Sequence, residues 1–175
     1  MPSEPLLSAA QRSFLGSARR AVLATIAPDG HPRLVPICFI VAGEPPVLYT
    51  PIDDKPKRSD DPFALARVRD IQADPRVTLL VDRWDEDWTR LAWLRTEGRA
   101  ALLEPSTGTA EHPVTVAALR AKYPQYATHR LDENPLIRIA LERVIDWGLS
   151  DRGRSPPPSG AGSESSSSPG GSRRR

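Results

Sequence analysis

Several residue types that would decide a fold or a chemistry are scarce in this chain. It has one cysteine in 175 residues, so no disulfide forms within the chain and no Cys-x-x-Cys pair exists for zinc or thiol redox chemistry. No apolar run approaches the about 18 residues that a membrane-spanning helix needs. Residues 1–20 lack a basic segment followed by an apolar core. We therefore expect a cytoplasmic protein that does not enter a membrane.

The excess of positive charge is confined to one end of the chain. Residues 151–175 contain five Arg and two acids among eight Ser, five Gly and four Pro, which leaves 19 basic and 20 acidic side chains in residues 1–150. A near-neutral body argues against nucleic-acid binding. The end segment has no large apolar side chain to offset the cost of ordering its backbone. We expect one domain over residues 1–150 and a disordered tail over residues 151–175.

Hydrophobic spacing predicts three helices and six strands. The helices are expected at residues 3–19, 60–73 and 113–123. The strands are expected at residues 20–27, 33–41, 47–50, 76–83, 91–103 and 135–147, the first three forming an antiparallel meander. Because strands follow one another with helices inserted between them, the pattern indicates an α+β fold built on a small six-stranded antiparallel barrel. The apolar residues expected on one face of the last strand are Ile137, Ile139, Leu141, Ile145 and Trp147.

The predicted strand at residues 33–41 is apolar on both faces. Pro36 cannot donate a hydrogen bond to a neighbouring strand, so the strand lies at an edge or carries a bulge there. Two interpretations stay open: a central strand with a bulge, or an edge whose second face is covered by another subunit or by a large flat ligand.

A basic run follows the third predicted strand. Lys55 and Lys57 point the same way in an extended chain, Arg58 is adjacent, and Thr50 adds a hydroxyl at the strand end. Three cations and a hydroxyl suit a phosphate or a carboxylate-rich ligand. A solvated basic loop is the alternative, and the neighbouring acids favour it.

The sequence carries no motif of conventional catalysis. His31, His112 and His129 lack metal-type spacing, and no metalloprotease, serine-hydrolase or phosphate-loop motif occurs. Cys38 lies within ICFIV, a setting typical of a buried, unreactive thiol. The acids of WDEDW (residues 84–88) are typical of a solvated hairpin loop. We expect no metal site and no catalytic side chain, which is compatible with an enzyme whose cofactor carries the electrons.

The order of these segments resembles the pyridoxamine 5′-phosphate oxidase-like split β-barrel flavoproteins over about residues 5–148. The stretches ATIAPDGHPRLVP and DPRVTLLV carry the resemblance to the superfamily. KPKR and VDRWDEDWTRLAWLRTEGRA resemble the actinobacterial subgroup assigned to the deazaflavin coenzyme F420. Asp70 departs from that subgroup, which often has Asn at this point of the helix.

The resemblance implies a homodimer with a cofactor site at each side of the subunit interface. Val35 and Pro36 would flank the cofactor ring. The phosphate or oligoglutamate tail would be held by Thr50, Lys55, Lys57 and Arg58. Candidates for the pocket wall, from either subunit, are Trp88, Arg95 and Trp147.

The resemblance also implies a function. We expect an F420-dependent oxidoreductase that passes a hydride from the reduced deazaflavin to an unsaturated small molecule. An FMN-dependent oxidase or reductase of the same fold is one alternative. A non-catalytic carrier of flavin, F420 or haem is the other.

Overall fold

The computed structural model describes residues 5–53, 61–106 and 108–149. The predicted tail and the basic residues Lys55, Lys57 and Arg58 lie outside this part of the chain. The strands are β1 (Ala21–Ile26), β2 (Pro32–Ile37), β3 (Ile40–Ala42), β4 (Val47–Pro51), β5 (Arg76–Arg83), β6 (Ala92–Leu103) and β7 (Leu136–Trp147). The helices are α1 (Ala9–Ser17), α2 (Ala66–Ala73) and α3 (Glu111–Lys122), with short 3₁₀ segments η1 (Pro62–Ala64), η2 (Trp88–Arg90) and η3 (Pro124–Thr128).

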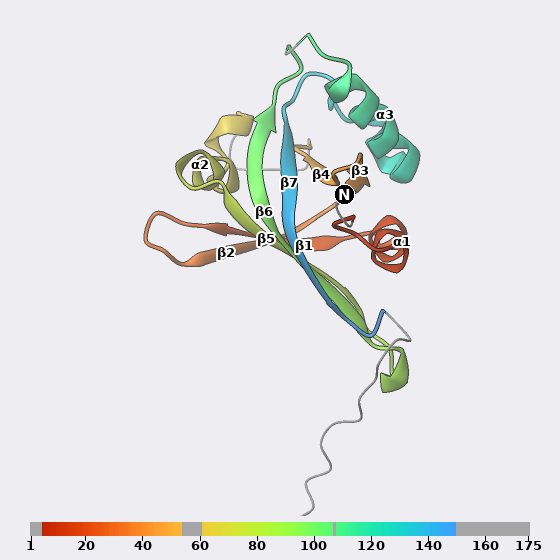
Figure 1. Cartoon of the computed structure of the whole chain (residues 1–175). Coiled ribbons are helices and arrows are strands. Elements are labelled where there is room, and N and C mark those ends of the chain that lie inside the picture. Colours follow the sequence, from red (N-terminus) through yellow and green to blue (C-terminus); the bar gives the residue numbers. More distant parts are fainter. Residues whose placement is uncertain (1–4, 54–60, 107, 150–175) are drawn as a thin grey trace, which may run out of the picture.

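The strands form one antiparallel sheet in the order β2-β1-β5-β6-β7-β4-β3 (Figure 1). This confirms the predicted α+β class. β2 and β3 form the two opposite edges of the sheet, yet only Cys38 and Phe39 separate them in the chain. Three extended residue steps span at most about 11 Å. The sheet must therefore curl until its edges nearly meet, which produces a split barrel.

The prediction of one continuous strand over residues 33–41 is wrong because the backbone of Phe39 leaves the sheet. The hydroxyl of Tyr123, at the end of α3, accepts the Phe39 N–H at 3.0 Å. The same hydroxyl donates to the Phe39 carbonyl at 2.8 Å, with the Arg19 carbonyl as a second acceptor at 3.1 Å. Phe39 itself is fully buried. One side chain thus satisfies both backbone groups of Phe39 and allows the chain to pass between the two edges.

This split also overturns the expected three-strand meander. β2 pairs only with β1, whereas β4 pairs with β3 and with β7. The strand at residues 47–50 was expected beside residues 33–41, but only the short β3 part of that segment is its neighbour. The division at Cys38–Phe39 sends the two halves to opposite edges of the sheet.

Two apolar clusters fill the molecule. The larger lies inside the curled sheet. It contains inward-facing residues of successive strands, such as Leu23, Leu79, Leu94 and Ile139, together with Phe39. The smaller packs α3 and η3 against β3 and β4. Because Leu48 belongs to the first cluster and Val47 and Tyr49 to the second, β4 is buried on both faces.

A bulge in β7 changes the face of its last residues. Glu97 pairs with Arg143 and Gly98 with Leu141, so Glu142 has no partner in β6. A Cβ on Gly98 would collide with the Ala140 carbonyl, which explains the glycine in β6. Side chains alternate along a strand, so one extra residue reverses the later ones. The prediction that Ile145 and Trp147 share the face of Leu141 is therefore wrong.

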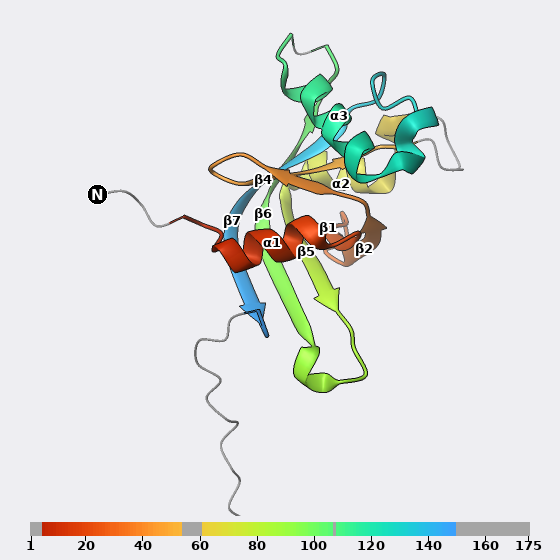
Figure 2. The same ribbon diagram turned by 90° about the vertical axis from the view of Figure 1, so that its right-hand side faces the viewer.

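The first two helices begin later than predicted, α1 at Ala9 and α2 at Ala66, whereas α3 begins at Glu111, earlier than the predicted residue 113. α1 begins at Ala9 because Ser8 and Gln11 form a reciprocal capping box. The second predicted helix is divided at Leu65 into η1 and α2. Figure 1 shows α1 and α2 on opposite sides of the central strands and α3 near one end of the sheet. Figure 2 shows the β5–β6 hairpin projecting away from the helices, with η2 at its tip.

Replacing Tyr123 by Phe should destabilise the fold. The variant keeps the ring but leaves the buried N–H and carbonyl of Phe39 without their shared partner, so we expect a loss of about 1–3 kcal/mol in unfolding free energy. Chemical denaturation measures this. Tyr49→Phe, which removes a hydroxyl bonded to the Glu111 side chain rather than to backbone, is the control with a smaller loss. An unchanged midpoint for Tyr123→Phe would contradict the role given to this hydroxyl.

Candidate functional site

A pocket of about 190 Å³ lies where the sheet is split. Its walls come from the end of β2, the end of β4, α2 and η3. The lining residues are Val35, Pro36, Ile37, Cys38, Thr50, Pro51, Asp53, Arg67 and Tyr126. The pocket exists because β2 and β4 diverge at the point where Cys38 and Phe39 cross from one edge to the other.

The polar groups of the pocket form a charged cluster. The Tyr126 hydroxyl donates to the Asp53 carboxylate at 3.3 Å, and both residues are buried. Burial lowers the pKa of the Arg67 guanidinium, while the Asp53 carboxylate acts in the opposite direction. Burial also raises the pKa of Tyr126, so its hydroxyl is protonated at neutral pH and available as a donor. The cluster therefore holds a cation, an anion and a hydroxyl in one small space.

Arg67 is the residue in this cluster that is best suited to bind a ligand. Its Nε is inaccessible to solvent and has no hydrogen-bond partner among the residues that the structure describes. A buried donor without an acceptor costs free energy, and guanidinium groups suit phosphate and carboxylate oxygens. The pocket thus fits an acceptor group of a bound ligand. Its volume is below the about 300–1,000 Å³ of complete small-molecule sites, so it holds only part of a cofactor-sized molecule.

The structure brings three of the predicted site residues together. Val35, Pro36 and Thr50 all line the pocket. Val35 also packs against the main core, whereas Pro36 is exposed at the edge strand. Lys55, Lys57 and Arg58 lie outside the described residues, although Asp53, which precedes them closely, is part of the pocket wall.

The other three predicted residues lie elsewhere on the chain. Arg95 lines a largely apolar hollow of about 550 Å³ on the outer face of β1, β2, β5 and β6, together with Leu34, Leu80 and Trp93. Trp147 pairs across the strands with Trp93 and is 46% exposed. Trp88 is 71% exposed at the tip of the β5–β6 hairpin. Within one chain these side chains do not join the pocket, so their assignment to its wall stays a prediction that needs a second subunit.

Sequence reasoning missed the other six residues that line the pocket: Ile37, Cys38, Pro51, Asp53, Arg67 and Tyr126. Cys38 was expected to be buried, but it is half-buried and faces the pocket. Arg67 and Tyr126 come from segments far apart in sequence, and nothing in their local patterns distinguishes them from surface residues. The approach of β2, β4, α2 and η3 is what makes them neighbours.

Asp70 anchors the helix that carries Arg67. Its carboxylate is 1% exposed and accepts the Thr25 hydroxyl and the Arg33 guanidinium, each at 2.8 Å. These bonds fix α2 to β1 and β2. The Asp at this position, which departs from the subgroup pattern, thus has a structural partner of opposite charge in Arg33.

Two of the three acids of the WDEDW loop, Asp85 and Asp87, bind groups of the protein. Asp87 accepts the backbone and side-chain groups of Thr89, and Asp85 pairs with Arg90 at 3.2 Å. In the described ranges no group of three or more His, Cys, Asp or Glu side chains is placed to hold a metal ion. Among the same residues no helix is long and apolar enough to cross a membrane.

A curled antiparallel sheet with peripheral helices and a pocket at its split defines the split β-barrel class. A family model for pyridoxamine 5′-phosphate oxidase matches residues 7–148, and the chain belongs to this family. No curated protein matches the sequence significantly.

Solved structures with the same fold carry different functional names. An F420 reductase is 20% identical, with a TM-score of 0.56, and the match covers 83% of this chain and 98% of the other. An FAD-binding protein from Mesorhizobium loti is 23% identical, with a TM-score of 0.53, covering 80% and 92%. The haem storage protein HutZ from Vibrio cholerae is 13% identical, with a TM-score of 0.59, covering 81% and 94%. At these identities the likeness establishes the fold alone.

Replacing Asp70 by Ala should destabilise the protein through loss of the α2 anchor. The variant leaves the buried Thr25 hydroxyl without its acceptor and Arg33 without its counter-ion, and we expect a loss of about 1.5–3 kcal/mol. Urea denaturation of the full chain measures it. Asp74→Ala, at the exposed pair with Arg76, is the control and should cost much less. Equal midpoints for the two variants would show that Asp70 is not an anchor.

Proposed function

We propose that the protein is an oxidoreductase that binds coenzyme F420 at the split of the barrel and reduces an unsaturated small molecule. The observation that carries the proposal is the buried Arg67 Nε, which lacks an acceptor in a pocket that Val35, Pro36 and Thr50 also line. An F420 reductase among the proteins of the same fold supports the choice of cofactor. The KPKR run at residues 55–58, which follows β4 after Ile52, Asp53 and Asp54, would add cations for the phosphate or the oligoglutamate tail.

The residues of this chain would bind, orient and shield the cofactor. Val35 and Pro36 offer an apolar edge for one side of a flat ring, and Arg67 with Thr50 would hold an anionic or carbonyl oxygen. The Tyr126 hydroxyl, kept protonated by burial, donates its one proton to Asp53, so it would offer a cofactor an acceptor lone pair and fix that carboxylate at the wall. When bound, the reduced deazaflavin would supply the hydride. The acceptor's proton would come from solvent or from a donor outside this cluster.

The protein would act as a homodimer. The outer face of the sheet presents Leu34, Leu80 and Trp147, all large apolar side chains that this chain leaves exposed. Contiguous exposed apolar surface of this kind marks association sites. Pairing through this face would cover it and would allow Trp88, Arg95 or Trp147 of one subunit to complete the pocket of the other, whose own volume is too small for the whole cofactor.

Two other functions have specific support. FMN-dependent oxidation or reduction in the same pocket is favoured by the FAD-binding protein of the same fold. A carrier of flavin, F420 or haem without turnover is favoured by the haem storage protein of the same fold. The ligand and the presence of turnover separate these functions.

Titration of the full chain should show tighter binding of F420 than of FMN or haemin. Quenching of tryptophan fluorescence and the ligand spectra give the dissociation constants, and loss of the reduced F420 signal with an unsaturated acceptor reports turnover. Arg67→Gln should weaken F420 binding by about 1.5–3 kcal/mol. Arg69→Gln, on the exposed side of the same helix, is the matched control. Lys55→Ala and Lys57→Ala should each weaken binding if the basic run holds the anionic groups.

The outcomes are distinct. Saturable binding of FMN without binding of F420 would replace the proposed cofactor by FMN. Binding of F420 without turnover of any acceptor would favour the carrier. Equal affinities for Arg67→Gln and Arg69→Gln would remove Arg67 from the site.

A further inference from the structure

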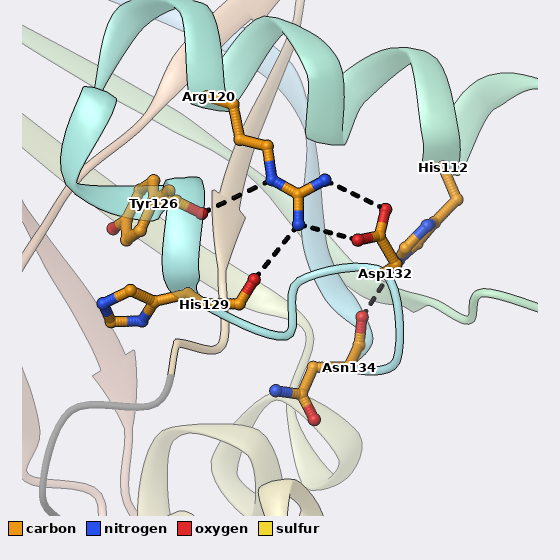
Figure 3. A network of polar contacts seen from close by, with 6 residues as sticks. All are labelled: His112, Arg120, Tyr126, His129, Asp132 and Asn134. Atoms are coloured by element: carbon orange, nitrogen blue, oxygen red, sulfur yellow. Dashed lines mark hydrogen bonds and ion pairs between the residues drawn. The ribbon is translucent and has the colours of Figure 1, made fainter.

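The guanidinium of Arg120 joins three segments near Tyr126, a residue of the pocket (Figure 3). Arg120, on α3, donates through Nε to the Tyr126 carbonyl at 3.4 Å and through Nη2 to the His129 carbonyl at 3.1 Å. Its Nη1 and Nη2 also donate to the Asp132 carboxylate at 3.2 and 2.7 Å. Arg120 therefore ties α3 to η3 and to the loop that follows η3.

These contacts use the geometry of a guanidinium. The backbone N–H of His129 already donates to the Tyr126 carbonyl at 3.2 Å, so Arg120 adds a second, longer contact there. At the His129 carbonyl, Arg120 supplies a donor from outside η3. Arginine offers five N–H groups in a planar fork, enough to reach two carbonyls and a carboxylate at once. The contact with Arg120 also lowers the pKa of Asp132, which keeps the counter-ion charged. A lysine in this place has one nitrogen and cannot make the same set.

The side chain of Tyr126 carries this restraint into the pocket. Its ring is buried and packs against Tyr123 and His129, with ring centroids 5.7 and 5.3 Å away. At the end of the side chain remote from the backbone, its hydroxyl donates to the Asp53 carboxylate. Asp53 in turn acts on the charge of Arg67. Arg120 thus fixes the end of η3, mainly through the His129 carbonyl and the Asp132 carboxylate, while the Tyr126 hydroxyl belongs to the pocket.

We propose that Arg120 is a positioning residue of the pocket: by holding η3 it keeps Tyr126 as a fixed wall and so controls both ligand affinity and access to Cys38. The affinity part rests on the proposed function, whereas the access part does not. Arg120 does not line the pocket and acts only through Tyr126.

The single cysteine gives a direct test. Cys38 lines the same pocket as Tyr126. The rate at which its thiol reacts with an aromatic disulfide reagent therefore measures how accessible the pocket is to that reagent. The full-length variants are Arg120→Lys and Arg120→Gln. Both should raise the Cys38 reaction rate about tenfold or more and weaken F420 or FMN binding by a similar factor. Arg120→Lys keeps the positive charge, but we expect its Cys38 reaction rate and its ligand affinity to match those of Arg120→Gln rather than those of the wild type.

Two controls separate positioning from loss of stability. Glu133→Gln removes an exposed ion pair with Arg130 in the same loop and should behave like the wild type. Val81→Ala removes core volume in β5, outside the set of residues that line the pocket, and should lower the melting temperature without changing the Cys38 rate. All rates are measured well below the melting temperature of each variant.

The Cys38 reaction rates test the role of Arg120 whichever ligand the protein binds. If the Arg120 variants melt lower but react at Cys38 no faster than Val81→Ala, Arg120 is a structural residue only and the proposal is wrong. If the wild type binds neither F420 nor FMN, the proposed function fails, and the Cys38 rates still show whether Arg120 holds the wall.

Discussion

The hydrogen bonds between the Tyr123 hydroxyl and the backbone of Phe39 are the interaction on which the rest of this structure depends. They satisfy a fully buried N–H and carbonyl at the one point where the chain crosses from one edge of the sheet to the other. Without them the crossing would leave two unpaired polar groups in the core, or β2 would continue as one long strand. The curled sheet, its split and the position of α3 all follow from this crossing.

The same crossing creates the pocket and explains its composition. The divergence of β2 and β4 exposes Val35, Pro36 and Thr50 to a common space, and α3 brings η3 with Tyr126 to its rim. The helix that Asp70 anchors to β1 and β2 adds Arg67. Elements that stabilise the fold therefore also place each polar group of the site. The pocket has an unsatisfied donor and an apolar edge, a combination that suits a flat ligand with oxygen acceptors.

Sequence patterns predicted most of the strands because their burial alternates with period two, as in β1 and β6. They failed where a tertiary contact decides the local structure. No sequence signal near Phe39 predicts that a contact with Tyr123 ends the strand there. Likewise, no signal near Glu142 predicts the bulge that moves the side chains of Ile145 and Trp147 to the other face of the sheet. The resemblance placed Val35, Pro36 and Thr50 in one site, but Arg67, Asp53 and Tyr126 required the approach of three distant segments. Reasoning from one chain also could not supply the second subunit that Trp88, Arg95 and Trp147 would need.

In the proposed function the split of the barrel, rather than the outer face of the sheet, receives the cofactor. Hydrogen–deuterium exchange of the full chain, with and without saturating F420 or FMN, tests it most directly. Binding at the split should slow exchange in the peptides that cover residues 35–38, 48–53 and 126–129. Saturable binding that protects only the outer-face segments at residues 78–82 and 93–95 would contradict it.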